Sequence, residues 1–243
     1  MFDVYITLKN EAALLPYFLR YYGDRPTCRR IVALDNSSDD GSLAILAAHP
    51  KVDIRTFVPS TDSYVCDVQV WVNEVWRESV GLVQYAILST VDEWVGPDLE
   101  TRLNSYSAAG VTVLRPQAYD MVSEDFRSPF DVTRGVPSSF YNKPFVIDPN
   151  AIRSSNFTLG THDAAFEGDV KLVSPKDLSI YHYRYLGREE TWARYQALQL
   201  MRQAGDIVKG CGSQYEMTRS DFDAKFDSLL QQAIELEPLR PPE

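Results

Sequence analysis

Hydrophobic and polar residues alternate along the first 116 residues in a way that predicts strands and helices in turn. Short β-branched and aromatic runs predict strands, and apolar residues spaced three and four positions apart predict helices. We expect strands at 2–8, 31–34, 52–58, 85–90 and 111–115, and helices at 12–22, 42–48, 64–79 and 99–109. This order favours parallel strands joined by right-handed crossovers, which is an α/β fold with helices flanking the sheet.

The pattern changes after residue 116. Residues 116–149 are rich in Pro, Ser, Asp and aromatic residues, which predicts long loops and short strands. Two further strands are expected at 157–163 and 171–185, and two helices at 189–203 and 220–235. We therefore expect a single domain over 1–237, made of a strand-and-helix half (1–116), a loop-rich half (117–205) and a C-terminal helical segment (206–237), with a loose tail at 238–243.

The charge balance excludes one class of partner. The chain has 24 Lys and Arg against 34 Asp and Glu, a net charge of −10, and no run of basic residues. A protein that binds a nucleic-acid backbone needs many cationic contacts, so we expect no nucleic-acid partner. A small anionic ligand such as a nucleotide diphosphate stays possible, because a divalent cation can offset local acidity.

Cysteine usage and hydropathy indicate the compartment. Cys28, Cys66 and Cys211 are widely spaced and form no C-x-x-C pair, so neither a disulfide framework nor a zinc site is expected. The N-terminus lacks the basic and apolar regions of a signal peptide, and no stretch approaches the ~20 apolar residues of a membrane span. We expect a cytoplasmic protein with no integral membrane segment.

Two expected strands end in carboxylates. Asp35 follows the strand at 31–34 and opens a polar turn, and Asp92 with Glu93 follows the strand at 85–90. Ligands of open parallel sheets bind beyond the carboxyl ends of the strands, so both places are candidates for ligand contact.

A structural interpretation of the same residues is also open. Asp39 or Asp40 can cap the helix that follows the first polar turn, and Asn10 with Glu11 can cap the helix after the first strand.

Several segments resemble a known family when taken in order. A resemblance to family 2 glycosyltransferases of the GT-A fold is found in segments 7–16, 34–42 and 91–94. A resemblance to the bacterial branch that overlaps with family 92 is found at Asp120-Met121, 143–146, 160–162 and 181–184. The resemblance covers about residues 3–205. It implies a Rossmann-like mixed sheet with a nucleotide-binding half at 1–116 and an acceptor and metal half at 117–205.

The resemblance also implies an activity. A sugar would pass from a nucleotide-sugar donor, expected to be UDP-linked, to a hydroxyl of a glycan, lipid-linked or protein-linked acceptor, with inversion at the anomeric carbon. The residues that would contact the nucleotide are Lys9, Asn10, Glu11, Asp35, Asn36 and Asn73. Asp35 would accept from a uracil N–H or a ribose hydroxyl, whereas a solvated amide is the simpler interpretation of Asn73.

A divalent metal, Mn²⁺ or Mg²⁺, is the cofactor that the resemblance implies. Asp92 occupies the last position of the family's D-x-D metal motif, and Thr90 stands where the motif has its first Asp. A hydroxyl is a poorer ligand than a carboxylate, so we expect weaker metal binding at this motif. His162 and His182 are further candidate ligands that would complete a Mn²⁺ site with Asp92.

Inverting transfer needs a base that takes the proton of the acceptor hydroxyl. Asp120 is the first candidate, at an expected turn after the strand 111–115, and Glu93 and Asp163 are the next two. A structural interpretation of Asp120 is that it caps this turn.

Two other functions are alternatives to that of a glycosyltransferase. The first is a catalytically inactive homologue or nucleotide-sugar binding protein, which the missing first Asp at Thr90 suggests. The second is a sugar-phosphate nucleotidyltransferase, a class that usually has a Gly-rich loop ending in Arg and Lys after the first strand. This chain has Lys9-Asn10-Glu11 at that place.

Overall fold

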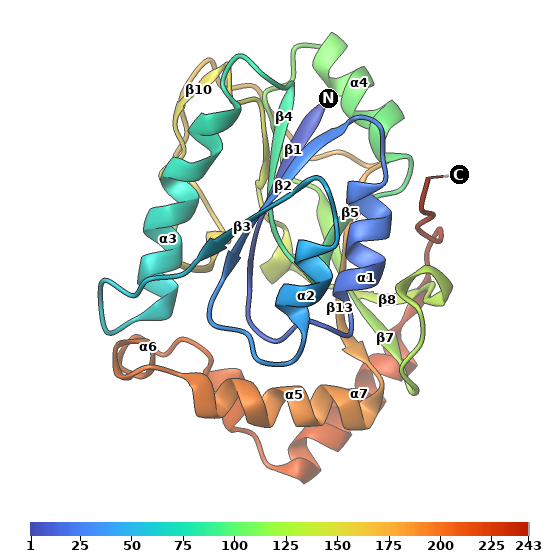
Figure 1. Ribbon diagram of the computed structural model, residues 1–243. Coiled ribbons are helices and arrows are strands. Elements are labelled where there is room, and N and C mark those ends of the chain that lie inside the picture. The colour runs from blue at the N-terminus through green and yellow to red at the C-terminus, as the bar shows by residue number, and fades with distance from the viewer. Residues whose placement is uncertain (243) are drawn as a thin grey trace.

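A seven-stranded mixed sheet forms the centre of the computed structural model, which describes residues 1–242 (Figure 1). Its strand order is β12-β6-β9-β4-β1-β2-β3. β1 pairs in parallel with β2 and β4, and β9 is antiparallel to β4 and β6. The strands are β1 (Phe2–Leu8), β2 (Cys28–Asp35), β3 (Val52–Thr56), β4 (Tyr85–Thr90), β6 (Val113–Leu114), β9 (Val146–Ile147) and β12 (Leu172–Val173).

The central strands are near-continuous apolar runs because helices and the second sheet cover both of their faces. Asp3 of β1 is fully buried and is stabilised by the guanidinium groups of Arg29 and Arg30 and by the Ser79 hydroxyl. A buried carboxylate needs such partners, since an unpaired buried charge is costly.

Helices flank this sheet in the first half of the chain. Ser63 caps α3 by accepting a hydrogen bond from the Cys66 N–H, and Val72, Val75 and Trp76 form the buried face of this helical segment. The helical elements are α1 (Leu15–Phe18), the π-helical turn η1 (Leu19–Gly23), α2 (Ser42–Ala47), α3 (Tyr64–Val75), the 3-10 turn η2 (Trp76–Ser79) and α4 (Leu99–Ala108).

A second sheet of five strands adjoins the first, in the order β14-β8-β7-β13-β5. Only Val91 and Asp92 separate β4 from β5, so the chain passes directly from one sheet to the other at this point. The five strands are β5 (Glu93–Gly96), β7 (Gln117–Ser123), β8 (Arg134–Pro137), β13 (Ser179–Leu186) and β14 (Ile234–Glu235). A separate pair is formed by β10 (Ile152–Ser154) and β11 (Glu167–Gly168).

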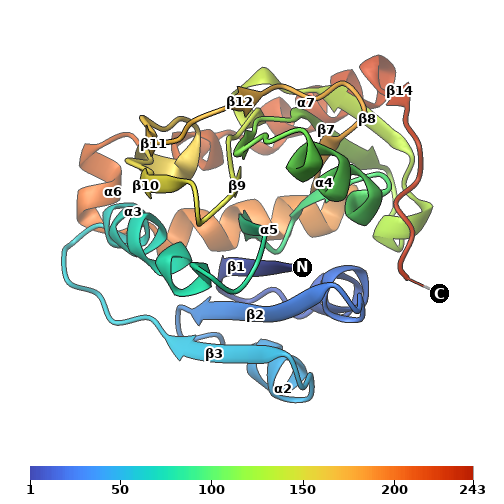
Figure 2. The same ribbon diagram turned by 90° about the horizontal axis from the view of Figure 1, so that it is seen from above.

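The C-terminal helices lie across the carboxyl ends of the central strands. Figure 1 shows α5 and α6 below these ends, and both figures place α6 next to α3 (Figure 2). Val122, Tyr185, Tyr195, Phe222 and Phe226 form a second core between this layer and the smaller sheet. The remaining helical elements are η3 (Pro129–Asp131), η4 (Ser139–Tyr141), η5 (Leu159–Thr161), α5 (Arg188–Met201), α6 (Ala204–Val208), η6 (Ser213–Glu216) and α7 (Arg219–Gln232).

The predicted α/β class and the mixed sheet flanked by helices are confirmed, and most element boundaries differ by a few residues. The expected strand 171–185 is wrong, since it is two strands, β12 and β13, in different sheets. The expected helix 12–22 is wrong in detail, since the α-helix begins at Leu15 and continues as a π-helical turn. Pro16 favours this start because the first helical turn leaves its N–H groups unpaired and proline has none.

Three further expectations differ from the structure. Strand β5 forms where a turn was expected, and β7 places Asp120 inside a strand rather than at a turn. The expected strand 157–163 contains the 3-10 turn η5, since Gly160 has a φ of 71°.

The tail differs as well. Leu239 is 1% exposed and packs over Gly96, where a side chain would collide with it. Within residues 1–242, no helix is both long and apolar enough to cross a membrane.

Candidate functional site

A cavity of about 640 Å³ lies at the carboxyl ends of β1 and β4. Thr7 and Leu8 of β1 and Ser89 and Thr90 of β4 line it. The chain moves from β1 to β2 and β3 on one side and returns to β4 on the other side, so β1 marks the point where the strand order reverses. Ligands of open α/β sheets bind at this switch point, so the cavity lies where the fold predicts a ligand.

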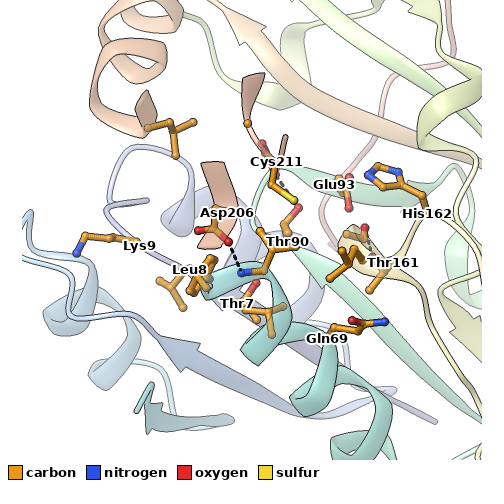
Figure 3. A pocket seen from close by; sticks show the side chains of 18 of the residues that line it. Thr7, Leu8, Lys9, Gln69, Thr90, Glu93, Thr161, His162, Asp206 and Cys211 are labelled. Atoms are coloured by element: carbon orange, nitrogen blue, oxygen red, sulfur yellow. Dashed lines mark hydrogen bonds between the residues drawn. The ribbon is translucent and has the colours of Figure 1, made fainter. Parts of the chain in front are cut away.

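The C-terminal segment forms one wall of the cavity. Asp206 of α6 accepts hydrogen bonds from the Ser63 hydroxyl, at 2.6 Å, and from the Val65 N–H, at 3.2 Å (Figure 3). The Gly205 N–H donates to the Asp62 carbonyl at 2.8 Å. A carboxylate at the N-terminus of α3 is also favoured by the helix dipole, so α6 is anchored by both hydrogen bonds and charge.

Asp92 lies at the junction of the two sheets with donors around it. The Thr90 hydroxyl donates to Asp92 Oδ1 at 2.7 Å, while Asp92 Oδ2 lies 3.1 Å from Arg194 Nη2 and 3.5 Å from His182 Nε2. Arg194 comes from α5 and also pairs with Glu11. Because Arg194 and His182 outweigh the effect of burial, the pKa of Asp92 is held well below its usual value.

Strand register places His182 between acids. His182 lies opposite Glu93 of β5 and Asp120 of β7, and its Nδ1 is 2.7 Å from Asp120 Oδ1. Burial alone would lower the pKa of His182, but hydrogen bonds to Asp120 and Asp92 outweigh it and raise the pKa. The hydrogen bond from His182 also outweighs the effect of burial on Asp120 and lowers the pKa of that carboxyl group.

Opposing effects set the pKa of Glu11. Burial raises the pKa of Glu11 to about 7; the Arg194 guanidinium opposes this rise, and the charges of Asp92 and Asp40 add to it. The carboxyl group therefore gains or loses its proton close to neutral pH.

A buried ion pair forms the floor of the other half of the cavity. Lys143 Nζ lies 2.7 Å from Glu93 Oε1, and the two side chains are 6% and 3% exposed. Arg184, on β13, also lines the cavity; its Nε donates to the Tyr195 hydroxyl at 3.1 Å and its Nη1 donates to the Tyr141 hydroxyl. Its Nη2 is buried without a partner among residues 1–242.

The lining of the cavity is more basic than the protein as a whole. Its basic side chains are those of Lys9, Lys143, Arg184, Arg194, Arg202 and Lys209. Its acidic side chains are those of Glu11, Asp92, Glu93 and Asp206. In a chain with a net charge of −10, this local excess of cations favours an anionic ligand.

His162 lies at the aromatic edge of the cavity. Its Nδ1 is 2.8 Å from the Phe140 carbonyl oxygen, and its ring centroid is 3.9 Å from the Phe140 ring. A carbonyl only accepts, so Nδ1 carries the proton and Nε2 has a free lone pair. Burial and the Lys143 charge lower the pKa of His162, which keeps the ring neutral at pH 7.

The predicted site residues divide into two groups. Those that line the cavity are Lys9, Glu11, Asn36, Asp92, Glu93, His162 and His182. Those that do not line it are Asn10, Asp35, Asn73, Asp120 and Asp163.

Asn10 and the loop after β2 hold each other in place. Asn10 Nδ2 donates to Asp39 Oδ1 at 2.8 Å, and the Asp39 N–H donates to Asn10 Oδ1 at 2.9 Å. Asp40 accepts from the Ala12 N–H at 2.9 Å and from the Ser42 N–H at 3.0 Å. The capping roles expected for these residues are wrong, since the N-caps of α1 and α2 are Leu14 and Gly41 and neither helix has a side-chain cap. The contacts instead fix the loop that carries Glu11.

Asp35 does not line the cavity, whereas the next residue, Asn36, does. The Oδ2 atom of Asp35 accepts from the Ser38 N–H at 3.1 Å, and its Oδ1 is buried without a partner in the described chain. The Asp35 side chain is therefore not among the cavity-lining groups, contrary to our expectation.

Asn73 was expected to face the nucleotide and does not. Its Oδ1 accepts from the Phe157 N–H at 2.7 Å and from the Ser155 hydroxyl at 2.8 Å. The amide fastens α3 to the 155–157 loop and has no capacity left for a ligand on this side. Asp163 pairs with Arg115 at the surface, and its side chain is 64% exposed.

The expected metal ligands do not form a metal site. Asp92 and His182 are neighbours, but both nitrogens of His182 face carboxylates, and His162 Nδ1 donates to a backbone carbonyl. Within residues 1–242, no group of three or more His, Cys, Asp or Glu side chains is placed to hold a metal ion. The residues at Asp92 therefore do not fit a divalent cation.

Three cationic side chains that line the cavity, those of Lys143, Arg184 and Arg194, were not predicted from the sequence. Lys143 and Arg184 lie inside segments that carry the family resemblance, so their position was a usable signal. Arg194 lies in an amphipathic helix among polar residues, where nothing distinguishes it from a surface arginine.

No protein-family model matches the chain, and no curated protein matches it. Among solved structures, the chain is similar to a crystal structure of S. aureus TarS 1-349, with a TM-score of 0.45 and 12% identity over 95% of this chain and 71% of that one. A crystal structure of S. aureus TarS gives a TM-score of 0.45 and 13% identity over 93% of this chain and 42% of that one. Similarity at this level concerns the general α/β arrangement alone.

Proposed function

We propose that this chain is a GT-A-type glycosyltransferase that moves a sugar from a nucleotide-sugar donor to a hydroxyl acceptor. The observation that carries the proposal is the cavity of about 640 Å³ at the strand switch point, with an excess of cations in an acidic protein. Cavities of roughly 300–1,000 Å³ hold small-molecule ligands. The ordered GT-A-like segments support the same function.

We propose one orientation for the donor in the cavity. Lys9, Asn36 and the Tyr64 side of α3 form the end that suits a nucleoside. Arg194 lies beside Thr90 and Asp92, where a diphosphate would meet a guanidinium. The sugar would then extend toward Glu93, His162 and the aromatic edge.

The chemistry is a single displacement. The acceptor oxygen forms a bond to the anomeric carbon, the bond from that carbon to the diphosphate oxygen breaks, and its electron pair leaves with the diphosphate. Attack from the opposite face inverts the configuration. The hydroxyl proton must pass to a base on the protein.

We assign this proton to Nε2 of His162. Its lone pair is free, because Nδ1–H donates to the Phe140 carbonyl, and the residue lines the cavity. Asp120 was the first candidate from the sequence, but its carboxylate binds His182 and does not line the cavity. We therefore propose that Asp120 is a positioning residue that acts through His182.

The function is tested with a panel of UDP-, GDP-, CDP-, dTDP- and ADP-linked sugars. At least one donor should raise the unfolding temperature of the wild type and be slowly hydrolysed by it, and the surface variant Arg153→Gln should behave like the wild type. If no donor stabilises the protein and none is hydrolysed, the proposal is wrong.

A second comparison tests the base. His162→Gln should lower kcat by about 10²–10⁴-fold while nucleotide affinity stays the same, as expected for loss of general base catalysis. The pH dependence of the residual activity should lose the limb that belongs to His162. An unchanged kcat and pH profile in this variant would contradict the assignment.

A further inference from the structure

The guanidinium group of Arg194 lies beside Asp92, at the position where a D-x-D motif would bind a metal ion. Asp92 Oδ2 lies 3.1 Å from Arg194 Nη2, and Asp92 Oδ1 accepts from the Thr90 hydroxyl at 2.7 Å. Arg194 also pairs with Glu11, so two carboxylates from different loops hold one cation at the switch point. A divalent ion at Asp92 would have to displace this guanidinium or lie next to it.

The acids near Asp92 offer no alternative ligand set. Thr90 replaces the first carboxylate of the motif, and Glu11 is bound to Arg194. The carboxylate of Glu93 is paired with Lys143 at 2.7 Å. In nucleotide complexes Mg²⁺ is held by one or two protein carboxylates together with phosphate oxygens and water. Here the carboxylates of Glu11 and Asp92 are paired with Arg194, and that of Glu93 is paired with Lys143.

Fixed cations are present instead. The cavity has more Lys and Arg than Asp and Glu side chains, and Arg184 Nη2 is buried without a partner in the described part of the chain. Guanidinium groups bind phosphate oxygens through two parallel hydrogen bonds and keep their charge at any physiological pH.

We infer, on the basis of the proposed function, that the donor diphosphate is bound by guanidinium and ammonium groups, Arg194 first, in place of a divalent cation. Arg194 would bridge its two carboxylates and the diphosphate, and it would stabilise the negative charge that develops on the leaving group. Nucleotide binding would then need no metal.

The experiment compares nucleotide affinity with and without metal. UDP, GDP, CDP, dTDP and ADP are titrated calorimetrically into the whole chain in excess EDTA and, separately, in excess Mn²⁺. The nucleotide that binds should give the same Kd in both conditions, within about twofold. In parallel, the electron paramagnetic resonance signal of free Mn²⁺ should fall no further with protein and nucleotide than with nucleotide alone.

Variants add a second readout. Arg194→Gln should weaken nucleotide binding in EDTA by roughly 10- to 100-fold, the range expected for a charge-assisted hydrogen bond, and Arg153→Gln should not. If Arg194→Gln does not fold, the wild-type titrations still decide the question. Binding that requires Mn²⁺ would overturn this inference and leave the proposed function standing. Binding in neither condition would overturn both.

Discussion

The buried pair of Lys143 and Glu93 gives a prediction about stability that can be worked from the structure. Lys143→Met removes the ammonium group 2.7 Å from a carboxylate whose side chain is 3% exposed. Breaking a buried pair by removing one partner costs about 3–5 kcal/mol, because the other charge stays buried without compensation. In a chain of this length about 1 kcal/mol shifts the unfolding temperature by roughly 2–4 °C, so we expect a decrease of about 6–20 °C.

Two matched variants separate this effect from a general loss of packing. The double variant Lys143→Met with Glu93→Gln leaves no uncompensated charge and should recover most of the lost stability. Arg153→Met breaks a surface ion pair between Arg153 and Glu167, whose side chains are 75% and 55% exposed. This variant should lower the free energy of unfolding by about 0–1 kcal/mol. Unfolding is followed by circular dichroism. If the single variant is as stable as wild type, or the double variant is no more stable than the single, the reasoning is refuted.

Three further predictions concern His182, the α6 anchor and the tail. The pKa of His182 is raised above its ordinary value of 6.5, so the contribution of His182 to stability is complete below pH 6.5 and is lost as the pH rises through the folded-state pKa. Urea unfolding at a series of pH values should show this loss in the wild type but not in His182→Gln. Asp206→Ala should cost about 1–2 kcal/mol and speed hydrogen exchange at 204–215, and unchanged exchange would contradict the anchor. Leu239→Ala should cost about 2–5 kcal/mol in urea unfolding, whereas Leu200→Ala, at an 87% exposed position, should cost almost nothing; equal costs would mean that the tail does not pack.

The centre of the fold was predictable because its strands bury both faces. Phe2–Leu8 and Tyr85–Thr90 are mostly apolar, and such runs favour a central parallel strand. Strands β5 and β7 were not predictable in the same way. They include or adjoin Asp, Glu, Gln and Pro residues, and they form strands by pairing with segments distant in sequence, β5 with β13 and β7 with β13 and β8.

The location of the candidate site could be predicted from the ends of the strands, but the hydrogen bonds and ion pairs within it could not. The rule that ligands bind at carboxyl ends indicated Asp92 and Glu93, which line the cavity, but also Asp35, which does not. The contact of His182 with Asp120 depends on the register of strands 62 residues apart, which no local pattern encodes. Arg194 reaches the cavity from a helix 183 residues after Glu11, so only tertiary packing brings the two together.

The central claim is that this cavity binds the nucleotide sugar, and a crystal structure with a bound donor tests it most directly. We expect density for the diphosphate within hydrogen-bonding distance of Arg194, the nucleoside between Lys9 and Tyr64, and the sugar beside His162. Clear density for the donor outside this cavity, or an empty cavity in crystals soaked with a donor that binds in solution, would contradict the account.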